Sequence, residues 1–304
     1  LKSSEQLIIN QVYVGLLKYH PKTLDVIPSL AKSWKSINNE TKYIFDLNKN
    51  AFFHDDVCFD NNIGRNIVAS DVKYSIEQIL HFHKKSQHNI SDQVKNISGV
   101  NAIIETDLSS KETNVSGIKT PNDSTIVFEL LKPDPMFFHF LASTNSLVFP
   151  KEAFEKYAFK STVGSGPFCF KYPEIKGKAI TLSANQNYFG RSKRNETLPF
   201  IDSIITSFIT SPPQELLLFE RGDLDLILGI NPTYISAFLE NHIDKFQSNP
   251  PYYIMKQTVD DYNNIQYNFV RANVRKIEIN SIGYFDFSEV YFKDPEIQEV
   301  NVLN

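Results

Sequence analysis

The first half of the chain alternates apolar and polar positions in short segments, as strands with one buried face do. In TKYIFDLNKN, residues 41–50, Tyr43, Phe45 and Leu47 fall on one face. STIVFELLKPD repeats the alternation from residue 124 and ends at Pro133, where a strand would lose a backbone donor. Both segments are predicted to be strands of an antiparallel sheet.

A helix is predicted between these strands, in ASDVKYSIEQIL. Ser70 is the expected N-cap, and Asp71 lies in the first turn, where a carboxylate is favoured by the helix dipole. The apolar residues recur at helical spacing as Val72, Ile76, Ile79 and Leu80. We expect this helix to lie against the sheet.

The second half combines strands and helices more closely. KAITLSANQNYFG alternates through Ile180, Leu182 and Ala184. SPPQELLLFERGDLDLILGI predicts a helix that begins at its prolines and ends at Gly222 in the C′ position, followed by a strand at 224–228. A helix, a glycine stop and a buried strand in this order are typical of a mixed α/β fold.

The length of the chain indicates how many cores it can form, and its charge indicates which classes of partner it can bind. A chain of 304 residues, 41% hydrophobic, is long enough for two cores. The 31 Lys and Arg and 35 Asp and Glu residues are intermixed, so we expect no nucleic-acid partner. The most apolar stretch, ELLLFERGDLDLILGI, is interrupted by charges and is too short for a membrane helix.

Motifs of catalysis and cofactor binding do not stand out. VGSGPFCFKY, residues 163–172, has two glycines of a dinucleotide fingerprint, but Pro167 lacks the N–H that a phosphate needs and a strand is expected to follow. No P-loop, H-E-x-x-H or G-x-S-x-G sequence is present. We therefore expect neither an enzyme nor a bound cofactor.

Three histidines and two aspartates could suggest metal ligands. His81 and His83 are two residues apart, so they point to different sides of a helix, and with His88 they are expected to mark a solvated helix end. Asp223 and Asp225 are expected at a turn and a strand edge, because the remainder of a calcium loop is missing.

The two cysteines, Cys58 and Cys169, are too few for a disulfide framework and are not spaced as zinc ligands. We expect two buried thiols, and the sequence leaves a single bridge open.

Several segments, taken in order, resemble the extracellular solute-binding proteins of the oligopeptide, dipeptide and nickel type (solute-binding family 5), which serve bacterial ABC importers. They begin with QLIINQVYVGLLKYHPKTLDVIPSLAKSWKS and YIFDLNKNAFFHDDVCF, in which Asp56 replaces a usual glycine and is expected to remodel the turn. They continue with ASDVKYSIEQIL and IKTPNDSTIVFELLKPDPMFFHFLA, and then VGSGPFCFKY, ITLSANQNYFG and LLFERGDLDLILG. The common order over almost the whole chain carries the resemblance.

The resemblance implies a periplasmic-binding-protein-like architecture of two lobes with mixed sheets flanked by helices. The first lobe is expected at 1–32 and 150–304, and a smaller α+β lobe at 33–149. The turn Gly164–Gly166, which tolerates unusual φ values, would mark the return to the first lobe. Family members usually insert a third, large lobe before the C-terminus, and its expected place, near 270–273, holds no such insertion here.

The resemblance also implies a binding function without catalysis, in which a solute, above all a peptide, is held between lobes and passed to a membrane permease. We expect one wall of the site at Lys2, Ser3 and Ser4, by analogy with the backbone edge that relatives offer to peptides. By position, we add Ser143, Thr144 and Asn145, and Gly164, Ser165 and Gly166.

Placement and solute remain open at this stage. The resemblance implies a periplasmic or cell-surface protein, expected to be a monomer, and lipid anchoring cannot be judged from a sequence that begins at Leu1. Peptide, nickel, haem and sugar ligands all occur among relatives. The alternative is a shortened binding-protein scaffold that acts as an interaction or regulatory module without transport.

Overall fold

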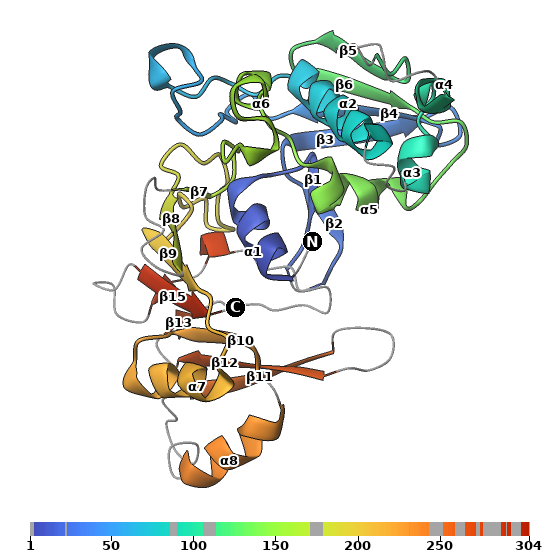
Figure 1. Ribbon diagram of the computed structural model, residues 1–304. Coiled ribbons are helices and arrows are strands. Elements are labelled where there is room, and N and C mark those ends of the chain that lie inside the picture. The colour runs from blue at the N-terminus through green and yellow to red at the C-terminus, as the bar shows by residue number, and fades with distance from the viewer. Residues whose placement is uncertain are drawn as a thin grey trace. The chain divides into compact units, whose positions relative to one another are not determined.

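The computed structural model describes residues 3–21, 23–85, 90–105, 114–170, 179–230, 232–242, 252–258, 265–271, 274–275, 287–289, 291–292 and 299–303. The chain divides into two compact units, each considered by itself (Figure 1). Unit 1 comprises residues 1–12, 21–24 and 167–304, and unit 2 comprises residues 13–20 and 25–166. The lobe limits expected from the sequence stay a prediction.

Unit 2 is built on a four-stranded antiparallel sheet in the order β3-β4-β6-β5. The strands are β3 (Ala31–Ile37), β4 (Lys42–Leu47), β5 (Ile118–Asn122) and β6 (Thr125–Glu129). Helix α2 (Ala69–Lys85) packs on β5 and β6, and Figure 1 shows it lying across the sheet. The strands and the helix predicted from the hydrophobic pattern are confirmed.

Aromatic side chains form the core on this sheet. Phe45 and Phe128 are completely buried, with ring centroids 5.8 Å apart in an edge-on arrangement. Phe137, from α5 (Phe137–Ala142), lies 5.3 Å from Phe128 and 5.6 Å from Tyr43. These rings bury large apolar areas and favour tilted contacts, so they fix how α5 packs on the sheet.

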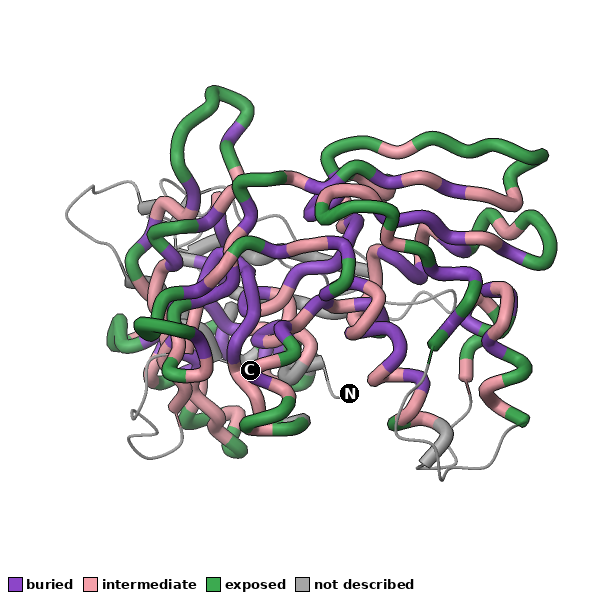
Figure 2. Tube along the Cα trace, turned by 90° about the horizontal axis from the view of Figure 1, so that it is seen from above, coloured by how far each residue is buried: buried purple, intermediate pink, exposed green. Residues whose placement is uncertain are grey.

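The remaining elements of unit 2 are short. They are β1 (Leu17–Tyr19), β2 (Val26–Pro28), η1 (Asp60–Asn62), α3 (Asp92–Lys95), α4 (Val100–Glu105), η2 (Thr144–Ser146), α6 (Lys151–Tyr157) and η3 (Ala158–Lys160). Figure 2 colours the chain by how far each residue is buried.

Unit 1 contains a seven-stranded mixed sheet in the order β11-β12-β10-β15-β9-β8-β7. The C-terminal strand β15 (Glu299–Leu303) pairs in parallel with β9 (Ser203–Ser207) and β10 (Leu226–Ile230). The outer strands are antiparallel: β7 (Phe168–Phe170), β8 (Ala179–Ala184), β11 (Tyr252–Thr258) and β12 (Ile265–Arg271). The predicted mixed α/β fold is confirmed.

Helix α7 (Pro212–Arg221) ends as the sequence predicts. Gly222 adopts the left-handed conformation with φ 93°. Its N–H donates to the Phe219 carbonyl, and the N–H of Asp223 donates to the Leu218 carbonyl, which together form a Schellman motif. Because this motif extends through Asp223, strand β10 begins at Leu226, two residues later than predicted.

Helix α7 covers β10 together with α8 (Pro232–His242), and Phe219, Ile227 and Phe238 are buried between them. Helix α1 (Ser3–Val12) packs near β7, and the Gln11 side chain accepts a hydrogen bond from the Phe287 N–H at 3.2 Å. Small elements among the described residues of the unit are β13 (Val274–Arg275), η5 (Phe287–Glu289) and β14 (Tyr291–Phe292). Among the helices that the structure describes, none is long and apolar enough to span a bilayer.

The start of α2 is held by Asp71 and not by Ser70. The helix begins at Ala69, two residues before the first helical residue expected after a Ser70 N-cap, and Ser70 is exposed. The Asp71 carboxylate accepts the free N–H of Val68 at 2.9 Å. The prediction of Ser70 as the N-cap is therefore wrong, because the carboxylate of Asp71, three residues after Val68, satisfies the first backbone donor instead.

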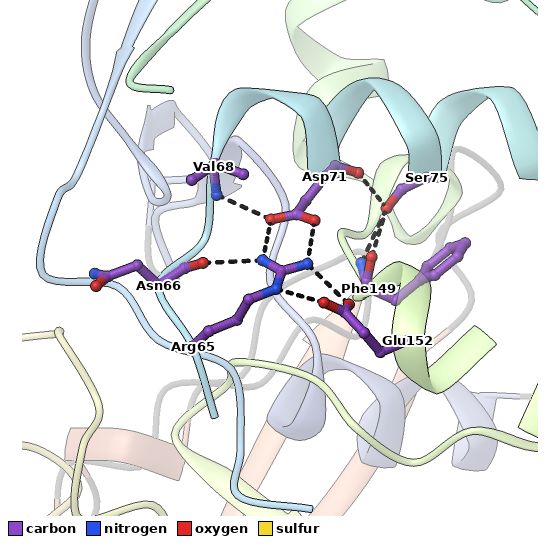
Figure 3. A network of polar contacts seen from close by, with 7 residues as sticks. All are labelled: Arg65, Asn66, Val68, Asp71, Ser75, Phe149 and Glu152. Carbon is purple, nitrogen blue, oxygen red and sulfur yellow. Dashed lines mark hydrogen bonds and ion pairs between the residues drawn. The ribbon is translucent and has the colours of Figure 1, made fainter. Parts of the chain in front are cut away.

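Asp71 also belongs to a charged network that connects three parts of unit 2 (Figure 3). Arg65 donates to both Asp71 oxygens at 2.8 Å and to both Glu152 oxygens at 2.7 and 2.9 Å. The hydrogen bonds from Arg65 lower the pKa of Glu152. The planar guanidinium also lies 5.3 Å from the centroid of Phe53. Because Asp71 belongs to α2 and Glu152 to α6, Arg65 connects the loop before α2 to both helices.

We predict that Asp71→Asn lowers the free energy of unfolding by about 1–3 kcal/mol, because it removes a charge whose side chain is 5% exposed and leaves Arg65 with one carboxylate. Urea denaturation monitored by circular dichroism measures the loss. Asp92→Asn is the matched control, since Asp92 also lies in a first turn but is 93% exposed. Equal effects of the two substitutions would contradict the role assigned to the network.

Candidate functional site

The turn Gly164–Gly166, at the end of unit 2, is held by the backbone and the buried side chain of His54. The His54 N–H donates to the Gly164 carbonyl at 2.8 Å, and the Gly164 N–H donates to Nδ1 of the ring at 3.3 Å. The ring Nε2 lies 3.0 Å from the Gly166 carbonyl. Residues far apart in the sequence thus satisfy each other's backbone groups just before the chain enters unit 1 at Pro167.

These contacts fix the protonation of the imidazole. Since Nδ1 accepts a hydrogen bond, Nε2 carries the proton and donates to Gly166, so the ring is neutral. Burial lowers the pKa of His54 from 6.5 to about 4, although the Gly166 carbonyl and Asp55 oppose the shift. The turn is therefore held by a neutral imidazole at physiological pH.

Neither glycine of this turn adopts the unusual backbone that the sequence suggested. The glycines with positive φ in the described part of the chain are Gly99, Gly222 and Gly229. The turn is shaped by its hydrogen bonds to His54 rather than by left-handed residues. Pro167 is followed directly by strand β7, as predicted.

Ser165 lies between the two glycines and is completely buried. Within the part of the chain that the structure describes, its hydroxyl has no hydrogen-bonding partner. A buried hydroxyl without a partner costs free energy, so a polar group at this position is expected to carry a function or to bind water. Of the three predicted turn residues, Ser165 is thus the one that can offer a side-chain donor.

The second predicted segment, Ser143–Asn145, consists of the residue between α5 and η2 and the first two residues of η2. The Ser143 hydroxyl accepts the Asn145 N–H at 3.2 Å and donates to the Phe140 carbonyl at 2.8 Å. Ser146 also donates to that carbonyl, at 2.8 Å. These bonds hold the loop in one conformation and leave the Asn145 side chain exposed to solvent.

The structure does not bring all the predicted residues into one described site. Lys2 lies outside the described residues, and Ser3 and Ser4 are the first residues of α1 in unit 1, described by their backbone alone. The two loops both belong to unit 2, where one is bonded to His54 and the other to Phe140. The binding role of all these residues stays a prediction.

The sequence predicts that Asp56 remodels its turn, but it identifies neither the partners of Asp56 nor the close approach at Gly64. Asp56, the residue in place of the usual glycine, accepts the Cys58 N–H at 2.8 Å and the Tyr157 hydroxyl at 2.8 Å, so its side chain forms the turn. Gly64 lies against the backbone of Phe53, where an added Cβ would come within 1.9 Å of the carbonyl oxygen. In the sequence, His54 is marked only by its position beside the motif around Asp56. Its hydrogen-bonding partner Gly164 lies 110 residues further along the chain, so no local pattern predicts the contact.

The candidate metal ligands remain dispersed. In the ranges that the structure describes, no group of three His, Cys, Asp or Glu side chains is placed to bind a metal. His81 and His83 are half-buried on α2, and His88 lies outside the described residues. Asp223 is paired with Arg221 at 3.2 Å, whereas Asp225 is buried at the start of β10.

The cysteines are separate thiols, half-buried rather than buried as expected. Burial, followed by the hydrogen bond to Asp56, raises the pKa of Cys58 to about 12. A protonated thiol is a poor nucleophile and a poor metal ligand.

We predict that His54 makes the protein less stable as the pH falls from 7 to 5. The unfolded chain binds a proton below pH 6.5, whereas the folded imidazole stays neutral down to about pH 4. The free energy of unfolding therefore rises with pH across this window. On acidification from pH 7 to pH 5 it falls by about 2 kcal/mol. Urea denaturation at both values measures it, with His54→Gln as the comparison, since Gln donates to Gly166 without titrating. Identical losses in both proteins would disprove the assignment.

Comparison with known proteins places this arrangement in a family. The family described as "Bacterial extracellular solute-binding proteins, family 5 Middle" matches residues 25–276. The dipeptide-binding protein of Escherichia coli K12 is 23% identical over 265 residues, which is 82% of this chain and 46% of the relative. The peptide transport periplasmic protein SapA of Salmonella typhimurium LT2 is 27% identical and covers 82% of this chain and 48% of its own length. The chain thus spans about half the length of the curated relatives it matches.

A solved structure shows the same fold. The periplasmic oligopeptide-binding protein of Borrelia burgdorferi superposes with a TM-score of 0.65 and 24% identity, over 84% of this chain and 47% of that one. The match of the family covers far more than half of the 304 residues. The chain therefore belongs to the bacterial extracellular solute-binding proteins of family 5.

Proposed function

We propose that this chain belongs to the substrate-binding component of an ABC importer, which captures a peptide between lobes and delivers it to a membrane permease. The observation that carries the proposal is the family match over residues 25–276. Relatives named for dipeptide binding and peptide transport support the choice of peptide as the solute. Binding without catalysis is consistent with these relatives.

The two loops of unit 2 suit the recognition of a peptide. The main chain of a peptide offers N–H and C=O groups whatever its side chains, so short polar residues can bind many sequences. Ser143 and Asn145 are held by local hydrogen bonds, and the buried Ser165 hydroxyl has no partner within the described part of the chain. We propose that these groups, with Thr144, Gly164, Gly166 and the edge formed by Lys2, Ser3 and Ser4, form one wall of the binding cleft.

The remaining parts of the proposal concern the whole protein. We place it in the periplasm or at the cell surface as a monomer, in agreement with the periplasmic relatives. We propose that the third lobe of such proteins is absent from this chain near residues 270–273, where β12 ends and before β13 begins. The first lobe would comprise 1–32 and 150–304, and the second 33–149.

We predict that the complete gene product binds di- and tripeptides saturably in isothermal titration calorimetry, whereas free amino acids bind far more weakly. Asn145→Ala and Ser165→Ala should each weaken peptide binding by about 3- to 10-fold, since a hydrogen bond is worth about 0.5–1.5 kcal/mol. Asn101→Ala is the control, because Asn101 is exposed on α4 and outside the proposed wall.

The two levels of the proposal fail in different ways. Unchanged affinity in both variants, with peptide binding intact, would refute the wall assignment alone. Absence of peptide binding in a correctly folded complete gene product would refute the peptide proposal. It would favour an interaction module that uses the same scaffold without transport.

A further inference from the structure

Unit 2 contains a small cavity beside α2 that the proposed peptide site does not explain. Its volume is about 180 Å³. The walls are mainly apolar and come from three helices, α2, α3 and α5, through Ile76, Ile79, Leu80, Val94 and Phe140. Four of these side chains are at least nine-tenths buried, whereas Ile79 is half-buried.

Besides the His83 imidazole of α2, two further polar side chains line the same cavity. Ser91 occupies the N-cap position of α3, yet its hydroxyl makes no capping hydrogen bond. Asn145 uses its backbone N–H to bond to Ser143, and its side-chain amide is exposed. Both side chains can therefore turn a donor or an acceptor towards a molecule in the cavity without giving up a bond described in the protein.

The size and lining of the cavity define what it can hold. Apolar cavities of about 150 Å³ lined by Leu, Ile and Phe stay dry and bind benzene-sized molecules. Here most of the wall is of that kind, but it also carries the imidazole of His83, an amide and a hydroxyl. Water would leave hydrogen bonds unmade against the isoleucines and Phe140, whereas an aromatic ring would gain contacts with them.

We propose that this cavity is a second binding site, which shares Asn145 with the proposed peptide wall, for a neutral molecule the size of one aromatic ring with a single hydroxyl group. The ring lies against Ile76, Ile79 and Phe140, and the hydroxyl bonds to Asn145 or Ser91. Because the buried area is small, the affinity for such a molecule is weak, with a Kd on the order of millimolar.

The test uses phenol as the probe and the methyl NMR signals of the isoleucines as the readout. Phenol should shift the Ile76 and Ile79 methyl signals saturably while the Ile63 signal stays constant, because Ile63 is 63% exposed on another loop. Phenol should bind about 3- to 10-fold more tightly than toluene, which lacks the hydroxyl.

Two variants separate the site from general effects on the protein. Ile79→Phe fills the cavity and should weaken phenol binding at least about tenfold. Ile63→Phe makes the same change at an exposed position and should leave it unaffected. Asn145→Leu should reduce the preference for phenol over toluene, and Asn145→Leu combined with Ser91→Ala should reduce it further, while toluene still binds.

The outcomes are distinct from those of the peptide proposal. Shifts that do not saturate, or that persist unchanged in Ile79→Phe with its folded signals intact, would overturn the second site. Equal affinity for phenol and toluene in the unaltered protein would overturn the role of the polar side chains. Neither result depends on whether the complete gene product binds peptides.

Discussion

A buried turn must satisfy its backbone hydrogen-bonding groups, and His54 does this for the turn on which the candidate site depends. One imidazole and one backbone amide satisfy groups of Gly164 and Gly166. A neutral imidazole accepts at Nδ1 and donates at Nε2, so one side chain satisfies a backbone donor and a backbone acceptor of the turn. The position of Ser165 follows, because it lies between the two residues that His54 holds.

The loop that leads from His54 to α2 is also held by polar side chains. After His54 the chain turns at Asp56, lies close to its own backbone at Gly64, and reaches Arg65. Arg65 then bonds to Asp71 and Glu152, which belong to α2 and α6. Each step places a polar side chain where a loop would otherwise leave donors or charges unpaired. Hydrogen bonds thus specify the loop together with the buried rings of Phe53 and Phe59.

Local patterns predicted the elements of the fold but not their long-range partners. The alternation around Tyr43 and Phe128, and the glycine stop at Gly222, depend on residues close in sequence, and both predictions are confirmed. In contrast, β15 lies between β9 and β10, although some 70 residues separate it from the nearer of the two. Nothing in its five residues specifies those neighbours, because the pairing is decided by which strand edges remain open.

The cavity beside α2 shows a further limit of sequence patterns. Ile76, Ile79 and Leu80 follow one helical periodicity, and periodicity identifies the apolar face without measuring how tightly it is filled. Two of the three are buried in the core, while Ile79 remains half-buried. Whether an apolar face meets a complementary surface depends on α3 and α5, which approach from segments 10 to 60 residues further along the chain. A binding site formed by incomplete packing therefore has no motif of its own, and only the three-dimensional arrangement reveals it.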